Sequence, residues 1–205
     1  MEAFLGIKGK DFVMLASVTM NTQQGMLQQE CILHPLNKHS MMTVVAVADG
    51  KSLKFKKRIL QHLGLFEVYN GHRLTLQAAV HYSSRNLLRF KRGHPNNQIT
   101  IMIGGFDSIN GPELHCIDYK GTVAAIPYGV RGSHPEFCDF LLQDLYKPNL
   151  DQELAYKALR SCAEKIKKKF VVNSFNFEVF VIQKEGTKRV TEEEFSKCDE
   201  SLINN

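Results

Sequence analysis

The sequence contains no tryptophan, and its thirteen phenylalanines and six tyrosines do not alternate with basic residues. Proteins that hold single-stranded nucleic acid stack the bases on aromatic side chains along a cationic groove. No hydrophobic run approaches the ~18 residues that a membrane-spanning helix needs. The opening residues 1–12 are also too polar for a signal peptide. We therefore expect a soluble, intracellular protein with no nucleic-acid or membrane partner.

The sequence also has few cysteines and only a small net charge. The five cysteines are odd in number and form no CxxC pair, which predicts free thiols in a reducing compartment. The 26 Lys and Arg against 21 Asp and Glu give a net charge of +5, which does not by itself indicate a polyanionic partner. The densest basic run, Lys165 with 167–169, is predicted to end a helix, where cations complement the exposed carbonyls.

The 205 residues suit one domain, which we place at 1–190, with 191–205 as a C-terminal tail. β-rich segments on either side of Gly9-Lys10-Asp11 predict an N-terminal hairpin. The apolar run 41–48 predicts a strand covered on both faces. Three further strands are predicted over 98–106, 113–119 and 175–182. The polar residues 19–29 and the glycine-spaced residues 128–132 are interpreted as loops.

Apolar residues at helical spacing predict two pairs of helices. The predicted stripes are Leu53, Ile59, Leu60, Leu63 and Phe66; Leu76, Ala79, Val80, Ser83, Leu87 and Phe90; Phe137, Phe140, Leu141 and Leu145; and Leu154, Ala155, Ala158, Leu159, Cys162, Ile166 and Phe170. Hairpin-connected strands with paired helices argue against a doubly wound parallel sheet. The predicted fold class is α+β, with two antiparallel sheets packed together and flanked by helix pairs.

Three segments, in order along residues 1–185, resemble proteasome beta subunits. They are the opening 1–17; Gly105-Phe106-Asp107 with Gly111-Pro112-Glu113-Leu114 and Asp118-Tyr119; and Tyr146-x-Pro148-x-x-Asp151 before Ala155, Leu159 and Cys162. The resemblance implies a four-layer αββα sandwich of the N-terminal-nucleophile hydrolase type. This fold agrees with the element order predicted above.

Active members of that family use an N-terminal threonine, whose amine serves as the base, with a lysine, an aspartate and an oxyanion-binding glycine. In this sequence the position of the threonine falls at Met1 or Glu2, and that of the lysine falls near Leu33. The position of the aspartate falls at about Val18, and that of the glycine falls near Val47. None of these residues supplies the required group, so we expect no catalytic residue, although Lys38 lies near the lysine position. Thr19 and Thr22 are rejected as nucleophiles because freeing either would remove the first hairpin.

Other reactive residues do not form a convincing site. Cys31, His34 and His39 offer three ligands where a structural zinc site needs four, so no metal is expected. Neighbours on a strand point to opposite faces, which separates His115 from Cys116. His134 and Cys138 are four apart on a predicted helix and could touch, but no third group orients them.

Gly104-Gly105 is interpreted as a close backbone approach or a bulge in a strand, since no phosphate-binding glycine motif occurs. We therefore expect no cofactor and no small-molecule substrate.

The resemblance implies a non-catalytic structural beta subunit of the 20S proteasome core particle, which degrades proteins in the cytoplasm and nucleus in an ATP- and ubiquitin-dependent way. Its partners would be the other alpha and beta subunits of a stacked-ring particle. Two alternatives stay open. One is an active threonine peptidase of the same fold, and the other is a free-standing interaction module.

Overall fold

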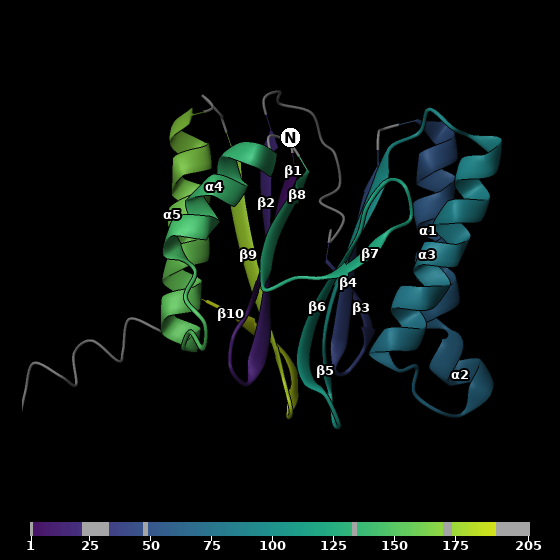
Figure 1. The fold of residues 1–205 in the computed structure, drawn as a ribbon, viewed down its shortest axis with the longest axis horizontal. Helices are drawn as coiled ribbons and strands as arrows, with labels where there is room; N and C mark the ends of the chain where they lie inside the picture. The colour runs from purple at the N-terminus through teal and green to yellow at the C-terminus, as the bar shows by residue number, and fades with distance from the viewer. Residues whose placement is uncertain (1, 22–32, 47–48, 133–134, 170–173, 192–205) are drawn as a thin grey trace, which may run out of the picture.

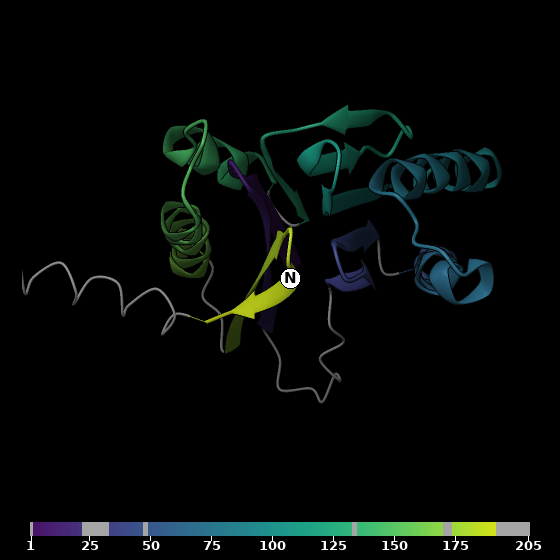
Figure 2. The same cartoon turned by 90° about the horizontal axis from the view of Figure 1, so that it is seen from below.

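The computed structural model describes residues 2–21, 33–46, 49–132, 135–169 and 174–191. These ranges form four layers, in which two five-stranded antiparallel sheets face each other and each carries helices on its outer side (Figure 1). Viewed from below, the two helix layers lie on opposite sides of the paired sheets (Figure 2). The predicted α+β fold, a four-layer αββα sandwich, is therefore confirmed. None of the described helices combines the length and apolar character that crossing a bilayer requires.

The first sheet has the strand order β10-β9-β2-β1-β8. Its strands are β1 (Glu2–Lys8), β2 (Phe12–Asn21), β8 (Tyr128–Gly132), β9 (Ser174–Gln183) and β10 (Gly186–Val190). The predicted N-terminal hairpin is β1 and β2, which pair from Glu2 with Thr19 to Lys8 with Val13. The hairpin occupies the middle of the sheet, because β9 pairs with β2 along its whole length and β8 pairs with β1.

The second sheet has the strand order β3-β4-β5-β6-β7. Its strands are β3 (His34–Asn37), β4 (Ser40–Ala46), β5 (Ile99–Asp107), β6 (Gly111–Ile117) and β7 (Val123–Ala125). Strand β4 is covered on both faces as predicted, since Met41 packs between the sheets while Met42 and Val44 pack under helices.

Two helix pairs cover the sheets. Helices α4 (Pro135–Leu145) and α5 (Gln152–Lys169) lie on the first sheet, and α1 (Gly50–Gly64) and α3 (Leu76–Gly93) lie on the second. The short α2 (Phe66–Asn70) connects the latter two and ends at Gly71, whose φ of 69° only glycine adopts readily. Asp49 and Thr75 cap α1 and α3 by accepting bonds from the first free backbone N–H groups.

Three apolar clusters hold the layers together. One lies between α4, α5 and the first sheet, and a second lies between α1, α3 and the second sheet. The third cluster, called the inter-sheet cluster below, consists of Phe4, Val13, Leu15, Leu33, Met41, Met102, Leu114 and Ile182. A fully buried side chain of this size contributes ~1.5–3 kcal/mol, so all three clusters are substantial.

The paired glycines in β5 permit close packing on both faces. A Cβ on Gly104 would lie 2.9 Å from Val13 of the opposite sheet. A Cβ on Gly105 would lie 2.8 Å from Leu76 of α3 and 3.1 Å from the His39 carbonyl. Real Cβ atoms essentially never come within 3.0 Å of another heavy atom, so both positions require the close approach that glycine allows, as predicted.

Two loop predictions are wrong. Residues 19–21 continue β2, because they pair with residues 174–176 of β9 despite their polar character. Residues 128–132 form β8, which pairs with residues 3–7 of β1. Glycine spacing disfavours a strand locally, but an adjacent central strand supplies the missing hydrogen bonds. The predicted loop residues 22–29 lie outside the described residues. Strands β3, β7 and β10 were not predicted, because segments of three to five residues give little periodic signal.

Three predicted core positions on the helices are also wrong. Leu53, Phe140 and Leu154 are 50%, 64% and 52% exposed. Each lies at one edge of its apolar stripe, and the helix turns that edge away from the sheet. The stripe predicted for α3 is confirmed, since Leu76, Ala79, Val80, Ser83 and Leu87 are buried and Phe90 packs against them. Phe170 lies outside the described residues, and nothing is described of the Phe137 side chain.

Candidate functional site

The first candidate site is the end of the sandwich where β1 begins and β2 ends. Glu2 is opposite Thr19 in the ladder, and Ala3 is opposite Val18. Thr19 also pairs with Asn176 of β9, so it sits within a three-strand ladder. Releasing it as a new N-terminus would remove β1 from the middle of the sheet, which supports its rejection as a nucleophile. Met1 and Thr22 lie outside the described residues.

Val18 points away from the space between the sheets. It is fully buried in the cluster beneath α4 and α5, together with Ala3 and Ala16. Alternation along β2 instead directs Ser17 and Thr19 toward the opposite sheet, on the same face as Leu15. The position matched to the orienting aspartate therefore contributes packing under the helices.

Leu33 lies in the inter-sheet cluster and is 1% exposed. An ammonium in those surroundings would be an unpaired buried charge, which costs several kcal/mol. Val47 lies outside the described residues. Lys38 does not replace the missing lysine, because it lies in the turn between β3 and β4, where its carbonyl accepts bonds from Thr187. The neighbouring His39 lies beside Gln183, at the opposite end of β2 from Thr19.

A thiol and a guanidinium meet between the sheets. Arg131 of β8 donates from Nε to Cys116 Sγ of β6 at 2.9 Å and from Nη1 to the Val130 carbonyl. Burial raises the pKa of the Cys116 thiol, and the positive charge of Arg131 opposes that shift. The net direction keeps the thiol protonated, so Cys116 is a poor nucleophile. The sequence analysis missed this contact, since its partners are 15 residues apart on strands of different sheets.

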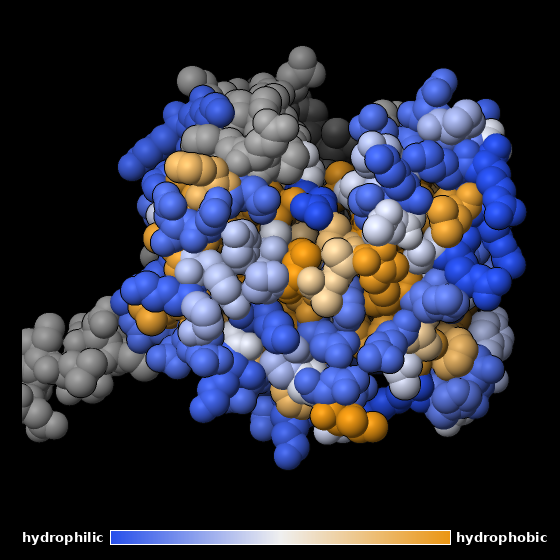
Figure 3. Space-filling model, in the orientation of Figure 1, coloured by the Kyte–Doolittle hydropathy of each residue, from blue (hydrophilic) through white to orange (hydrophobic). Residues whose placement is uncertain are grey.

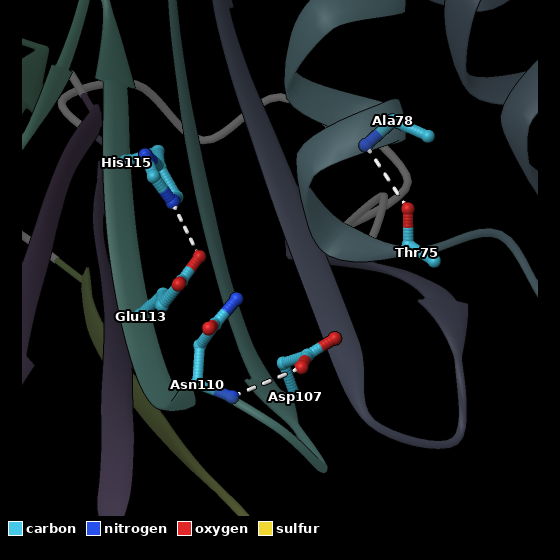
Figure 4. A network of polar contacts seen from close by, with 6 residues as sticks. All are labelled: Thr75, Ala78, Asp107, Asn110, Glu113 and His115. Atoms are coloured by element: carbon cyan, nitrogen blue, oxygen red, sulfur yellow. Dashed lines mark hydrogen bonds and ion pairs between the residues drawn. The ribbon is translucent and has the colours of Figure 1, made fainter.

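Cys116 is separated from His115 as predicted. Leu114 of β6 packs between the sheets, so Glu113 and His115 occupy the opposite face, toward the helices. His115 Nε2 and Glu113 Oε2 are 2.8 Å apart (Figure 4). Both side chains are largely buried, and His115 Nδ1 has no hydrogen-bond partner within the described ranges. The sequence analysis missed this pair, although residues two apart on a strand lie on the same face.

The neighbouring polar contacts in Figure 4 are structural. Asp107 accepts from the backbone of Ile109 and Asn110 and so closes the turn between β5 and β6. Thr75 caps α3 by accepting from the Ala78 N–H. Among the described residues, no hydrogen bond links a hydroxyl or a thiol to the His115–Glu113 pair.

The remaining candidate residues give no reactive centre. Cys138 and Cys162 are buried in the cluster beneath α4 and α5, where burial raises their pKa values to about 11 and about 12. His134, predicted to approach Cys138, lies outside the described residues, as does Cys31 of the suggested zinc set. Across the part of the chain that the structure describes, no three His, Cys, Asp or Glu side chains gather as metal ligands.

The family described as "Proteasome subunit" matches residues 2–182 of the chain. Proteasome subunit beta type-4 of Saccharomyces cerevisiae is 28% identical over 193 residues, which cover 93% of this chain and 97% of that protein. Proteasome subunit beta type-2 of Oryza sativa subsp. japonica is 28% identical over 190 residues, covering 92% and 89%. Probable proteasome subunit beta type-4 of Schizosaccharomyces pombe is 26% identical over 198 residues, covering 93% and 99%.

Proposed function

Because this chain belongs to the proteasome subunit family, as a divergent beta subunit, we propose that it is a non-catalytic, structural member of the 20S core particle. The observation that carries the proposal is Leu33, which occupies the position matched to the lysine and is buried among apolar side chains. Activating a threonine hydroxyl at neutral pH needs a base and a nearby positive charge. Leucine supplies neither.

The other matched positions support the same proposal. Val18, matched to the aspartate, lies in the apolar cluster under α4 and α5, together with Ala3, its partner on β1. The sequence provides Met1 and Glu2 where a nucleophilic threonine is needed. The inner faces of the two sheets are joined by Phe4, Leu15 and Met102 among others. Such a chain contributes the shape of a proteolytic chamber and leaves peptide cleavage to other subunits.

The proposed partners are the other alpha and beta subunits of a stacked-ring particle that degrades proteins in the cytoplasm and nucleus. A closed ring of different subunits requires each member to present two complementary side faces, so an inert member is retained for its geometry. Residues 1–17 resemble beta type-2 subunits, which stand at the fourth position of the beta ring, and we propose that position here.

The boundaries of the folding unit are part of the proposal. Val190, the last residue of β10, is 8% exposed and packs in the cluster under α4 and α5. We propose one domain over 1–190, with 191–205 as a tail that serves assembly. Deleting the tail should leave the melting temperature unchanged while reducing the fraction of the chain found in particles.

Purification of particles through a tag on the full chain tests the proposal. An electrophilic probe that labels N-terminal threonines should label other subunits of the same particle and leave this chain unmodified, with its N-terminus intact by mass spectrometry. Stoichiometric labelling of this chain would identify an active peptidase instead. A chain that sediments alone, with no proteasome subunit bound, would support a free-standing module.

A further inference from the structure

The segment that forms α1, α2 and α3 carries a larger net positive charge than the whole protein. Residues 50–94 contain ten Lys and Arg and one acidic residue, Glu67, which gives this segment a net charge of +9. The whole chain carries only +5, so the rest of it has a net charge of −4. Hydrophilic side chains accordingly dominate the outer edge of the α1–α3 layer in Figure 3.

This charge is not balanced inside the described structure. The ion pairs found among the described residues include one from this layer, Arg73 with Glu67 at 3.7 Å. Asp49, at the start of α1, is already engaged, because its carboxylate accepts from the Lys51 and Ser52 N–H groups and from the Asn97 side chain. The cations also repel one another, since Lys54 and Arg58 are four residues apart on one helix.

Four of these cations surround a groove of about 390 Å³ between α1 and α3. The rim residues are Lys51, Lys54 and Arg58 of α1 and Arg89 of α3, and all four are exposed. Phe55 and Phe90 lie in the groove with their ring centroids 4.8 Å apart, and His94 stacks on Phe90 at 4.5 Å. The groove therefore combines a cationic rim with an aromatic floor.

We propose that this α1–α3 groove binds an acidic segment of another polypeptide. Carboxylates of that segment pair with the rim, and an apolar side chain covers the half-buried ring of Phe90. The groove's position is independent of the missing catalytic groups. The identity of the partner as another proteasome subunit rests on the proposed function. Binding relieves the mutual repulsion of the rim cations, none of which is found in an ion pair within the described residues.

The composition of the surface favours a polypeptide over nucleic acid. Leu53 lies on α1 next to Lys54 and is 50% exposed, so apolar area is interspersed with the charges. The aromatic floor is poorly placed to stack a base, because Phe55 is only 9% exposed and His94 already stacks on Phe90. Protein interfaces, by contrast, combine apolar contacts with charged rims. The charge itself would attract either partner, and the experiment below separates them.

A pair of charge-matched triple variants of the tagged full chain tests the proposal. The groove variant is Lys54→Gln with Arg58→Gln and Arg89→Gln. The control is Lys147→Gln with Lys165→Gln and Lys168→Gln, which removes the same charge from exposed residues of the α4–α5 side. Co-purifying subunits should fall about tenfold for the groove variant and stay near wild type for the control, because exposed ion pairs contribute modestly and additively.

Salt dependence and cross-linking identify the contact. Rising salt should release partners from the wild type and the control, and it should have less effect on the groove variant, whose interface has lost its charge pairs. A photo-reactive benzophenone amino acid in place of Lys54 should cross-link to an acidic peptide of another proteasome subunit. Cross-links to nucleic acid, to a segment without acidic residues, or to nothing would overturn the proposal, as would equal recovery of both triple variants. If instead the wild type binds no proteasome subunit, the proposed function fails, while an acidic cross-linked peptide would still support the groove.

Discussion

The two helix layers have the same structural role and different surface chemistry. Each covers one sheet and buries an apolar cluster beneath it. Residues 50–94 of the α1–α3 layer carry +9, whereas residues 135–169 of the α4–α5 layer contain seven basic and six acidic residues, a net charge of +1. Helix α5 pairs its charges along its own surface, in Lys157 with Glu153 and Arg160 with Glu164. Packing thus fixes the inner face of a helix and leaves the charges of its outer face unconstrained.

The buried sides of the two layers also differ. The cluster under α4 and α5 contains the thiols of Cys138 and Cys162, whereas the described members of the cluster under α1 and α3 include no thiol. Thiols ionise at alkaline pH, so we expect alkaline pH to destabilise the α4–α5 layer through its buried side chains. We expect salt and charge substitutions to affect the α1–α3 layer through its exposed side chains.

The largest expected loss of stability comes from truncating a buried side chain on the inner face of either helix layer. Leu159→Ala on α5 and Ile59→Ala on α1 should each lower the free energy of unfolding by about 2–5 kcal/mol, because both side chains are at most 3% exposed. Chemical denaturation of the full chain measures this. The matched controls Leu154→Ala and Leu53→Ala, on the outer faces, should stay within about 0.5 kcal/mol of wild type. A small loss at either core position would show that its layer is loosely packed.

Alkaline pH should weaken the α4–α5 layer selectively. Burial raises the pKa values of Cys138 and Cys162 to about 11 and about 12, against 9.0 for an ordinary thiol. The folded state therefore holds these protons more tightly than the unfolded state, so stability is complete below pH 9 and declines between pH 9 and about 12. The slope approaches about 1.4 kcal/mol per pH unit for each thiol.

Unfolding curves of the wild type and of Cys138→Ala with Cys162→Ala, recorded across that pH range, measure this contribution. The variant should have a lower stability at neutral pH and a flatter decline above pH 9. An equally steep decline in the variant would assign the alkaline sensitivity to other groups, such as Cys116, whose pKa burial also raises.

Removing the N-terminal cap of α1, in the α1–α3 layer, should have an intermediate effect on stability. Asp49→Ala should lower the melting temperature more than Thr75→Ala does, because the Asp49 carboxylate accepts from two backbone N–H groups and also from the Ser52 hydroxyl. Thr75→Ala at the start of α3 should cost about 0.5–1 kcal/mol, since that hydroxyl accepts a single bond of 3.2 Å. Thermal melting compares the two variants, and a larger loss at Thr75 would contradict the ranking.

The smallest effect should differ in sign between the layers. Glu164→Gln on α5 removes the pair with Arg160 and should cost about 0.3–0.5 kcal/mol. Arg85→Gln on α3 removes a cation four residues from Arg89 and should be neutral or slightly stabilising, because like charges at this spacing repel. Melting at low salt should reveal the difference, and high salt should remove it. Destabilisation by Arg85→Gln would indicate an intramolecular partner for that cation.

The order of the longer strands and the pairing of the helices could be predicted from the sequence, because each depends on patterns within one segment. The run at β4 is apolar on both faces, and the turn residues between β5 and β6 indicate a hairpin. Strand β8 could not be predicted, since its glycines give no strand signal and its pairing with β1 joins residues more than 120 positions apart. Helix stripes were right at their centres and wrong at their edges, where the angle between helix and sheet decides exposure.

From the sequence alone we expect that the positions matched to the nucleophile, the lysine and the aspartate carry unsuitable side chains, an expectation that depends on residue identity and not on the fold. The sequence by itself also determined the net charge of +9 over residues 50–94. Only the tertiary structure decided where these features lie. Leu33 became part of the inter-sheet cluster because a second sheet covers it, and Val18 turned toward the helices because β2 alternates between two packed faces. The cations became the rim of one groove because α1 and α3 pack side by side, which depends on contacts between distant segments that local patterns do not encode.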